Sequence, residues 1–262
     1  MLEVKDIYKT FNPGTVNEKH ALNGVSLSLK EGDFVTVIGS NDAGKSTLLN
    51  AIAGLWMVDS GSIKIAGDDI TKLPDYKRAK YIGRVFQDPM LGSAATMQIE
   101  ENMALAARRG KRRTLRKGIT QQERENYREL LKELNLGLED RLTSKVGLLS
   151  GGQRQALTLL MSTMEKPKLL LLDEHTAALD PKTAAKVLEL TEKLVSENNL
   201  TTFMVTHNMR DALKYGNRLI MMCDGKIIFD VEGEEKKKLE VKDLLDKFNT
   251  AGGIVSDAMM LG

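Results

Sequence analysis

Hydrophobic and polar positions in the first part of the chain follow the two-residue period of β-strands. Val25, Leu27 and Leu29 alternate with serines, the pattern of a strand with one buried face. Residues 34–38 then form a nearly continuous apolar run, which is typical of a strand covered on both faces. We therefore expect strands near the N-terminus and a buried strand that begins at residue 34.

The period changes after this buried strand. A glycine-containing loop follows it, and residues 46–53 predict a helix that ends at Gly54. The segment 99–141 is charged and rich in helix formers, and we interpret it as a helical lobe inserted into an α/β core. Strand, glycine loop and helix in this order predict an α/β nucleotide-binding unit.

The α/β rhythm returns from residue 169. Two strands alternate with two helices, at 169–172, 183–196, 201–206 and 208–214. Asp224 and Gly225, between two apolar runs, predict a hairpin. After residue 232 the pattern predicts a charged helix at about 241–248 and then a glycine-rich tail that we expect to fray.

Composition excludes several classes of protein. The chain has 262 residues, 42% of them hydrophobic, enough to bury the core of one large domain with an inserted lobe. A net charge of +2 gives no global field for nucleic acid. Cys223 is the only cysteine, which excludes an internal disulfide and a multi-cysteine zinc site. No apolar run approaches the roughly 18 residues of a spanning helix, and the N-terminus does not read as a signal peptide. We expect a soluble protein that reaches a membrane only through partners.

The loop after the buried strand carries the phosphate-binding motif G-x4-G-K-[ST]. Its residues are Gly39, Ser40, Asn41, Asp42, Ala43, Gly44, Lys45, Ser46 and Thr47. Glycines let backbone N–H groups cradle phosphate oxygens at the positive end of the next helix. Lys45 adds a charge for the β- and γ-phosphates of ATP, and the Ser46 hydroxyl is a ligand for Mg²⁺. The alternative, a chance glycine-rich turn, is disfavoured by the strand and helix on either side.

Two adjacent carboxylates follow the apolar strand at 169–172. Because ligands bind at the carboxyl ends of strands in open α/β folds, Asp173 is placed to orient the Mg²⁺ shell. Glu174 is then placed to accept a proton from the water that attacks the γ-phosphate. The alternative is an ordinary helix start, where acidic residues are common. The pairing with the phosphate loop favours the functional interpretation.

Residues 149–155, Leu-Ser-Gly-Gly-Gln-Arg-Gln, resemble the signature sequence that distinguishes ABC ATPases from other P-loop proteins. Further landmarks of this family occur in the right order over about residues 2–230. Gln87 resembles the Q-loop glutamine, Leu179-Asp180 the D-loop and His207 the switch histidine, and Phe11 falls where the family stacks an aromatic ring on adenine. Spacing alone would not choose His207 among the three histidines; the resemblance does.

The resemblance implies the fold of the family: an α/β P-loop NTPase (RecA-like) core with an N-terminal antiparallel β subdomain and an inserted helical subdomain. We expect an ATPase domain over residues 1–230, with the helical lobe at about 88–155, followed by a C-terminal helix and flexible tail over 231–262. The resemblance also implies catalytic roles for Glu174, His207 and Gln87, and a Mg²⁺ shell formed with Ser46, Gln87 and Asp173.

The signature residues Ser150, Gly151, Gly152 and Gln153 form a second anion site. The glycines expose N–H groups at the start of a helix that we expect from residue 153 to about 164. In the family this site reaches the γ-phosphate of ATP held by the opposite subunit. The resemblance therefore implies a dimer that closes around two ATP molecules and shares each active site. For Ser150 alone, the alternative is an ordinary helix cap.

The implied function is that of the ATP-hydrolysing subunit of an ABC transporter, at the cytoplasmic face of the cell membrane. The expected partners are a second, identical ATPase subunit, transmembrane permease subunits and an extracytoplasmic substrate-binding protein, as in bacterial importers. We expect no nucleic acid, since the basic run at 108–117 lacks aromatic residues for base stacking. The alternative for the whole chain is a soluble ABC-type ATPase in macromolecular assembly. The segment 206–209 faintly resembles ATPases of amino-acid importers with a lipoprotein receptor.

Asp42 departs from the family, which usually has glycine at this position. Asp tolerates the left-handed conformation better than most residues do. A carboxylate that points inward repels the triphosphate and weakens ATP binding, whereas one that points to solvent is harmless. A nucleotide-binding regulatory module disabled by Asp42 is a further alternative. We assign no role to His175, which follows Glu174.

Overall fold

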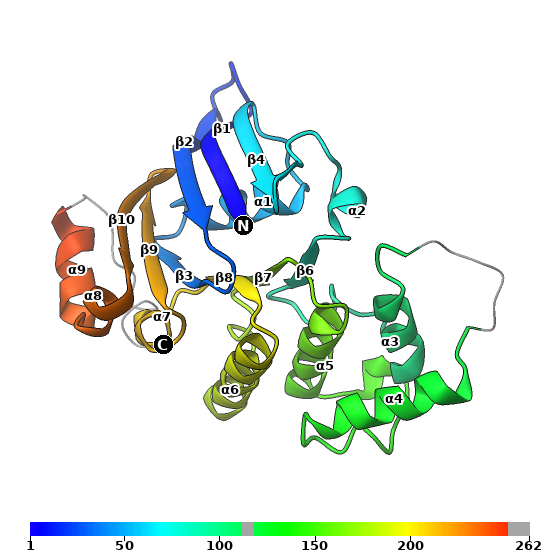
Figure 1. Ribbon diagram of the computed structural model, residues 1–262. Helices are drawn as coiled ribbons and strands as arrows, with labels where there is room; N and C mark the ends of the chain where they lie inside the picture. The colour runs from blue at the N-terminus through cyan, green and yellow to red at the C-terminus, as the bar shows by residue number, and fades with distance from the viewer. Residues whose placement is uncertain (112–117, 251–262) are drawn as a thin grey trace.

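The computed structural model describes residues 1–111 and 118–250, which form two sheets and their covering helices (Figure 1). Part of the basic run (112–117) and the end of the expected C-terminal tail (251–262) lie outside the described residues. The expected α/β class is confirmed, with one antiparallel sheet of four strands and one mixed sheet of six.

The antiparallel sheet has the order β2-β1-β4-β5 and lies at the N-terminal end of the chain. Its strands are β1 (Leu2–Phe11), β2 (Lys19–Leu29), β4 (Ser60–Ile65) and β5 (Asp68–Asp69). The alternation predicted in β2 is confirmed, because Val25, Leu27 and Leu29 are buried while the serines between them are exposed. The buried side chains pack with α1 (Lys45–Ala53) and the second sheet in one hydrophobic core.

The second sheet has the order β10-β9-β3-β8-β7-β6. Its strands are β3 (Phe34–Gly39), β6 (Ile82–Val85), β7 (Leu169–Asp173), β8 (Thr201–Val205), β9 (Arg218–Cys223) and β10 (Lys226–Glu232). All neighbouring pairs are parallel except β9 and β10, which form the predicted hairpin. The strand β3 is buried along its whole length, since α1 covers one face of the sheet and α7 (Met209–Lys214) contributes to the other.

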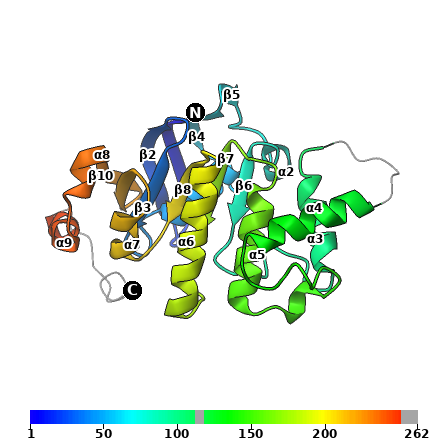
Figure 2. The same cartoon turned by 60° about the horizontal axis from the view of Figure 1, so that its bottom comes forward.

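The helical lobe has a hydrophobic core of its own. It contains α3 (Ile99–Ala107), α4 (Gln121–Lys132) and α5 (Gly151–Thr163), with the short helix η1 (Val146–Leu148) between the last two. Leu131, Leu134 and Leu157 are among the buried residues of this core. Figure 2 shows α3, α4 and α5 together on one side of α6 (Pro181–Glu197). The core of the lobe extends to Met161, and the lobe limits 88–155 stay a prediction.

The C-terminal segment packs on β9 and α7. The charged helix expected at about 241–248 is α9 (Val241–Thr250), which buries Leu244 and Phe248 against α7 and the sheet. A short helix before it, α8 (Gly233–Lys237), was not predicted, and neither was α2 (Asp75–Arg78). Within the described ranges, no helix combines the length and apolar character needed to cross a bilayer.

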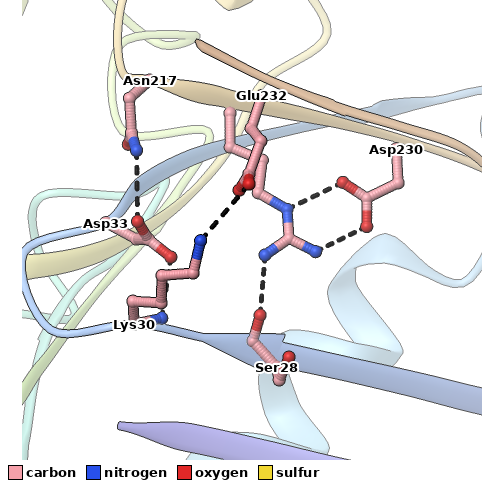
Figure 3. A network of polar contacts seen from close by, with 7 residues as sticks. Ser28, Lys30, Asp33, Asn217, Asp230 and Glu232 are labelled. Carbon is pink, nitrogen blue, oxygen red and sulfur yellow. Dashed lines mark hydrogen bonds and ion pairs between the residues drawn. The ribbon is translucent and has the colours of Figure 1, made fainter.

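Polar contacts join the two sheets near the end of β2 (Figure 3). The guanidinium of Arg218 donates two hydrogen bonds to the Asp230 carboxylate and one, of 2.7 Å, to the backbone oxygen of Ser28. Lys30 pairs with Glu232 at 3.3 Å, and Asn217 donates to Asp33 at 3.1 Å. These contacts link β2 to β9 and β10, and so fix the antiparallel sheet against the core that carries the nucleotide loop.

Candidate nucleotide-binding site

The strand order of the core sheet brings the sequence motifs together at one edge. The strands β3, β8, β7 and β6 are neighbours and run parallel, so their carboxyl ends lie side by side. The phosphate loop follows β3, His207 follows β8, the pair Asp173 and Glu174 ends β7, and Gln87 follows β6. Four motifs that are far apart in the sequence therefore share one edge, as the resemblance implied.

The phosphate loop has the backbone that its glycines predict. Gly44 is the N-cap of α1 with a φ of 95°. A side chain there would place its Cβ only 2.5 Å from the backbone oxygen of Ala21 in β2, so only glycine fits. Gly39, Ala43, Gly44 and Lys45 are buried, Ser40 and Thr47 are half-buried, and Asn41, Asp42 and Ser46 are exposed. The exposed Ser46 hydroxyl lies in the first turn of α1, where backbone N–H groups lack intrahelical partners.

The Lys45 amine is held inside this loop. Its Nζ donates hydrogen bonds of 2.7 Å to the Gly39 oxygen and 2.9 Å to the Ser40 oxygen. Burial lowers the pKa of Lys45, while Glu174, Asp173 and Asp42 raise it. The negative charges of these three carboxylates favour the protonated form of the Lys45 amine. In a loop of this kind, that amine lies where phosphate oxygens bind. The loop, the helix start and Lys45 fit the triphosphate of ATP.

Asp173 is oriented by a residue that the sequence did not single out. Arg84 of β6 donates from Nη2 to the Asp173 carboxylate at 3.1 Å and to the Asn50 side chain of α1 at 2.7 Å. Burial raises the pKa of Asp173, and the charge of Arg84 opposes that shift. The only available signal was a cation within the otherwise apolar strand β6. Only one carboxylate oxygen takes the Arg84 bond. Oxygen is the donor that Mg²⁺ prefers, so the Asp173 carboxylate and the Ser46 hydroxyl fit that ion.

Glu174 and His207 face each other at the ends of β7 and β8. The Glu174 Oε2 lies 3.7 Å from the His207 Nδ1, and the Glu174 N–H donates to the Val205 oxygen at 3.0 Å. The contact with His207 lowers the pKa of Glu174, and the same contact raises the pKa of His207. Glu174 has a φ of 43°, an uncommon conformation for a residue other than glycine. Of the adjacent carboxylates Asp173 and Glu174, it is Glu174 that contacts a histidine.

This contact predicts an observable titration. The His207 imidazole should titrate above its ordinary pKa of about 6.5, because its cation is stabilised by Glu174. The Glu174–His207 contact therefore contributes stability that is fully present below the ordinary pKa of histidine and is lost as the pH rises through the raised pKa of His207. Imidazole signals measured by NMR against pH test this, with Glu174→Gln expected to lower the pKa of His207. An unchanged pKa in that variant would contradict the contact. Burial lowers the pKa of His175 to about 4, so its signal is distinguishable.

Two predicted residues remain, Gln87 and Phe11. Gln87 is exposed just after β6, and among the described residues no hydrogen bond joins its side chain to another group. Phe11 ends β1 and packs edge-on against Trp56, with ring centroids 4.9 Å apart. The residue opposite Phe11 in β2 is Lys19, whose amine contacts Asp42. The strand opposite Phe11 therefore contacts the phosphate loop through Lys19.

The signature residues lie at the start of α5. The Ser150 Oγ accepts from the Gln153 N–H at 3.3 Å, and the Gln153 side chain accepts from the Ser150 N–H at 3.2 Å. The prediction that the helix starts at residue 153 was wrong, because this reciprocal capping extends α5 back to Gly151. In the part of the chain that the structure describes, no hydrogen bond or ion pair joins these residues to the phosphate loop.

A buried glutamine, not anticipated from the sequence, links the signature helix to the strand ends. Gln155 is fully buried and donates to the Phe86 oxygen at 3.0 Å and the His175 oxygen at 2.6 Å. Phe86 precedes Gln87, and His175 follows Glu174. His175 itself is buried against Thr191 at 3.0 Å, which gives it a packing role.

A surface groove lies between the core and the helical lobe. Residues of the segment 91–94, of α3 and of α5 line it, together with Arg84 and Arg109. Two large apolar side chains at its rim, Leu91 and Leu105, are 68% and 57% exposed. Exposed apolar side chains around a groove are typical of a protein interaction site.

Comparisons with known proteins agree on one family. The profile described as "ABC transporter" matches residues 22–177. The chain is 48% identical to a tyrosine transport ATP-binding protein of Clostridioides difficile over 96% of this chain and all of that protein. It is 36% identical to a methionine import ATP-binding protein of Clostridium tetani, over 94% of this chain and 76% of that protein. A bacitracin export ATP-binding protein of Halalkalibacterium halodurans is 29% identical over 98% of this chain and 99% of that protein.

The solved structures that resemble this chain are also ATP-binding cassettes. A dimeric ATP-binding cassette in a post-hydrolysis state, bound to ADP and Pi, has a TM-score of 0.75 and 32% identity, covering 88% of this chain and 98% of that one. The ADP conformation of an ATP-binding cassette of an ABC transporter has a TM-score of 0.77 and 28% identity, over 95% of this chain and 98% of that one.

Proposed function

The chain belongs to the ABC transporter ATP-binding family, and we propose how its residues perform the ATP hydrolysis that drives transport in this family. It is an ATP-binding subunit and an ATPase. The proposal rests on one observation: the phosphate loop, the pair Asp173 and Glu174, and His207 lie at the ends of the neighbouring strands β3, β7 and β8.

The phosphate loop and Phe11 bind the nucleotide. Backbone N–H groups of residues 39–47 and the start of α1 receive the phosphate oxygens. Lys45 exchanges its two loop acceptors for the β- and γ-phosphates. Phe11 stacks on adenine, and its half-buried position at the end of β1, opposite the Lys19 that contacts the phosphate loop, supports this role.

Glu174 is the general base. Its carboxylate accepts a proton from the water that attacks the γ-phosphate, and its low pKa keeps it deprotonated at neutral pH. His207 lies 3.7 Å away and holds that carboxylate in place. Ser46, Gln87 and Asp173 would hold Mg²⁺, which when bound would neutralise phosphate charge. The hydrogen bond from Arg84 keeps Asp173 directed toward this position.

Two identical chains share each active site. Ser150, Gly151 and Gly152 present N–H groups and a hydroxyl to the γ-phosphate of ATP on the partner chain. The dimeric state of the cassette structures that resemble this chain supports this arrangement. ATP then closes the dimer, and hydrolysis reopens it.

Permease subunits dock on the groove between the core and the helical lobe, at the cytoplasmic face of the membrane. The exposed Leu91 and Leu105 at the rim, and the nearby Gln87 loop, support docking there. We further propose an amino-acid importer with an extracytoplasmic binding protein. The support is the high identity to a tyrosine transport ATP-binding protein, with a methionine import protein also among the relatives.

Phosphate release tests the enzymatic part of this proposal. The purified chain should release phosphate from ATP only with Mg²⁺, and Lys45→Ala should lower the rate by about a hundredfold or more. No release by the unmodified chain would favour a regulatory module disabled by Asp42. Affinity purification from detergent-solubilised membranes tests the partners: recovery without hydrophobic subunits would favour a soluble assembly ATPase.

A further inference from the structure

The carboxylate of Asp42 has a partner that lies outside the phosphate loop. The Lys19 amine, at the start of β2, donates to the Asp42 Oδ1 at 2.5 Å. Asp42 has a φ of 68°, the left-handed conformation that the glycine of the family adopts freely. Its side chain is 80% exposed, so the carboxylate lies at the rim of the loop beside Lys19.

The fold places Lys19 there through close backbone packing. β2 runs directly over the phosphate loop, where the Ala21 oxygen leaves no space for a side chain at Gly44. The turn between β9 and β10 fixes the other side, since the Gly225 N–H donates to the Ala43 oxygen at 3.1 Å and the Gly225 oxygen accepts from the Asn23 N–H at 2.9 Å. With Ala21 and Asn23 held against the loop, Lys19 lies within reach of Asp42.

The Asp42 carboxylate is close enough to the phosphate site to affect the binding of a triphosphate. Lys19 lowers the pKa of Asp42, and Lys45 contributes to the same shift. A carboxylate within the electrostatic range of Lys45 is also within the range of the phosphates that Lys45 binds. Without a partner, it would repel the triphosphate by a screened interaction of about 1 kcal/mol, or about fivefold in affinity.

We propose that Lys19 is a positioning residue for nucleotide binding, which holds the Asp42 carboxylate at the rim and neutralises it so that the loop accepts a triphosphate. This inference rests on the proposed function, because it assumes that ATP binds the phosphate loop. The exposed pair adds little to folding stability. The Lys19–Asp42 pair instead reduces the negative charge near the phosphate loop, where the nucleotide binds.

A double-mutant cycle tests this role. ATP affinity is measured by isothermal titration for the unmodified chain, Lys19→Met, Asp42→Asn and the double variant. Lys19→Met should weaken ATP binding by about fivefold, and ADP binding by less, because ADP carries less charge. Adding Asp42→Asn to Lys19→Met should restore most of that loss. Asp42→Asn in the unmodified background should improve affinity much less, since Lys19 already neutralises the carboxylate.

The remaining outcomes overturn the proposal. Equal effects of Asp42→Asn in both backgrounds mean that Lys19 does not act through Asp42, either because it binds phosphate directly or because it has no role. No loss of ATP affinity in Lys19→Met also overturns it. If the proposal holds, the difference between the effects of Asp42→Asn in the two backgrounds should become smaller as the salt concentration is raised, because the Lys19–Asp42 pair is partly exposed.

Three further measurements serve as controls for the double-mutant cycle. Lys237→Met removes an exposed lysine of α8, one that pairs with Glu234 outside both sheets, and should leave ATP affinity unchanged. Thermal unfolding of each variant reports folding. Lys45→Ala separates the two proposals: if it abolishes ATP binding while the cycle shows no coupling, the role of Lys19 is wrong and the ATPase site stands. If Lys45→Ala leaves ATP binding intact, the proposed site itself is wrong.

Discussion

Replacing Glu174 by glutamine is expected to lower Mg²⁺-dependent ATP hydrolysis by about 10²- to 10⁴-fold, the usual contribution of a general base. ATP binding should change little, because the phosphate loop, Lys45 and Asp173 remain. The amide keeps the size of the side chain but cannot accept the proton of the attacking water. Since closure of the dimer needs ATP and reopening needs its hydrolysis, this variant should accumulate as an ATP-bound dimer.

Two measurements check this expectation. Phosphate release gives the rate, and size-exclusion chromatography with Mg²⁺ and ATP gives the state of association. Glu197→Gln, at the exposed end of α6, is a matched control that should retain both activity and the monomer–dimer equilibrium. A Glu174→Gln variant that stays monomeric with ATP would contradict the dimer or the role of Glu174. One that hydrolyses ATP at the normal rate would show that the base is elsewhere.

Mixing two inactive variants should restore activity if the active site is shared. A Lys45→Ala chain cannot bind the phosphates, and a chain changed at Ser150 cannot complete the site of its partner. In a mixed dimer, one site combines the intact loop of one chain with the intact signature of the other. An equal mixture should then recover about a quarter of the normal rate, since about half of the dimers are mixed and each has one complete site.

The substitution at Ser150 must remove the hydroxyl without destabilising the start of α5. Ser150 caps α5, and alanine would cost the helix about 1 kcal/mol. Asparagine also caps helices well, so Ser150→Asn removes the hydroxyl while it preserves the helix start. This variant alone should bind ATP normally as a monomer and hydrolyse it poorly. No recovery at any mixing ratio, with both variants folded, would contradict active sites shared between chains.

The sequence predicted the local elements of this protein well, because their signals are contiguous. Alternating residues in β2, the apolar run of β3 and the hairpin at Asp224-Gly225 each act over a few neighbouring positions. The phosphate loop and the start of α1 were recognisable for the same reason: glycine conformation and helix-end N–H groups are short-range properties. The limits of α5 were less accurate, since capping by Ser150 and Gln153 moved its start to Gly151.

Contacts between distant segments were decided by the tertiary structure. The strand order β3-β8-β7-β6 sets which residues meet, and no spacing in the sequence encodes it. Arg84 reaches Asp173, and Gln155 connects α5 to the strands that carry Gln87 and Glu174, only because those elements pack together. The same holds for Asp42. The sequence marked it as a departure from the family and left its direction open, whereas the packing of β2 over the phosphate loop supplies Lys19 as its partner. Residue type and local spacing determined which groups the site contains, and the register and packing of strands determined which of them touch.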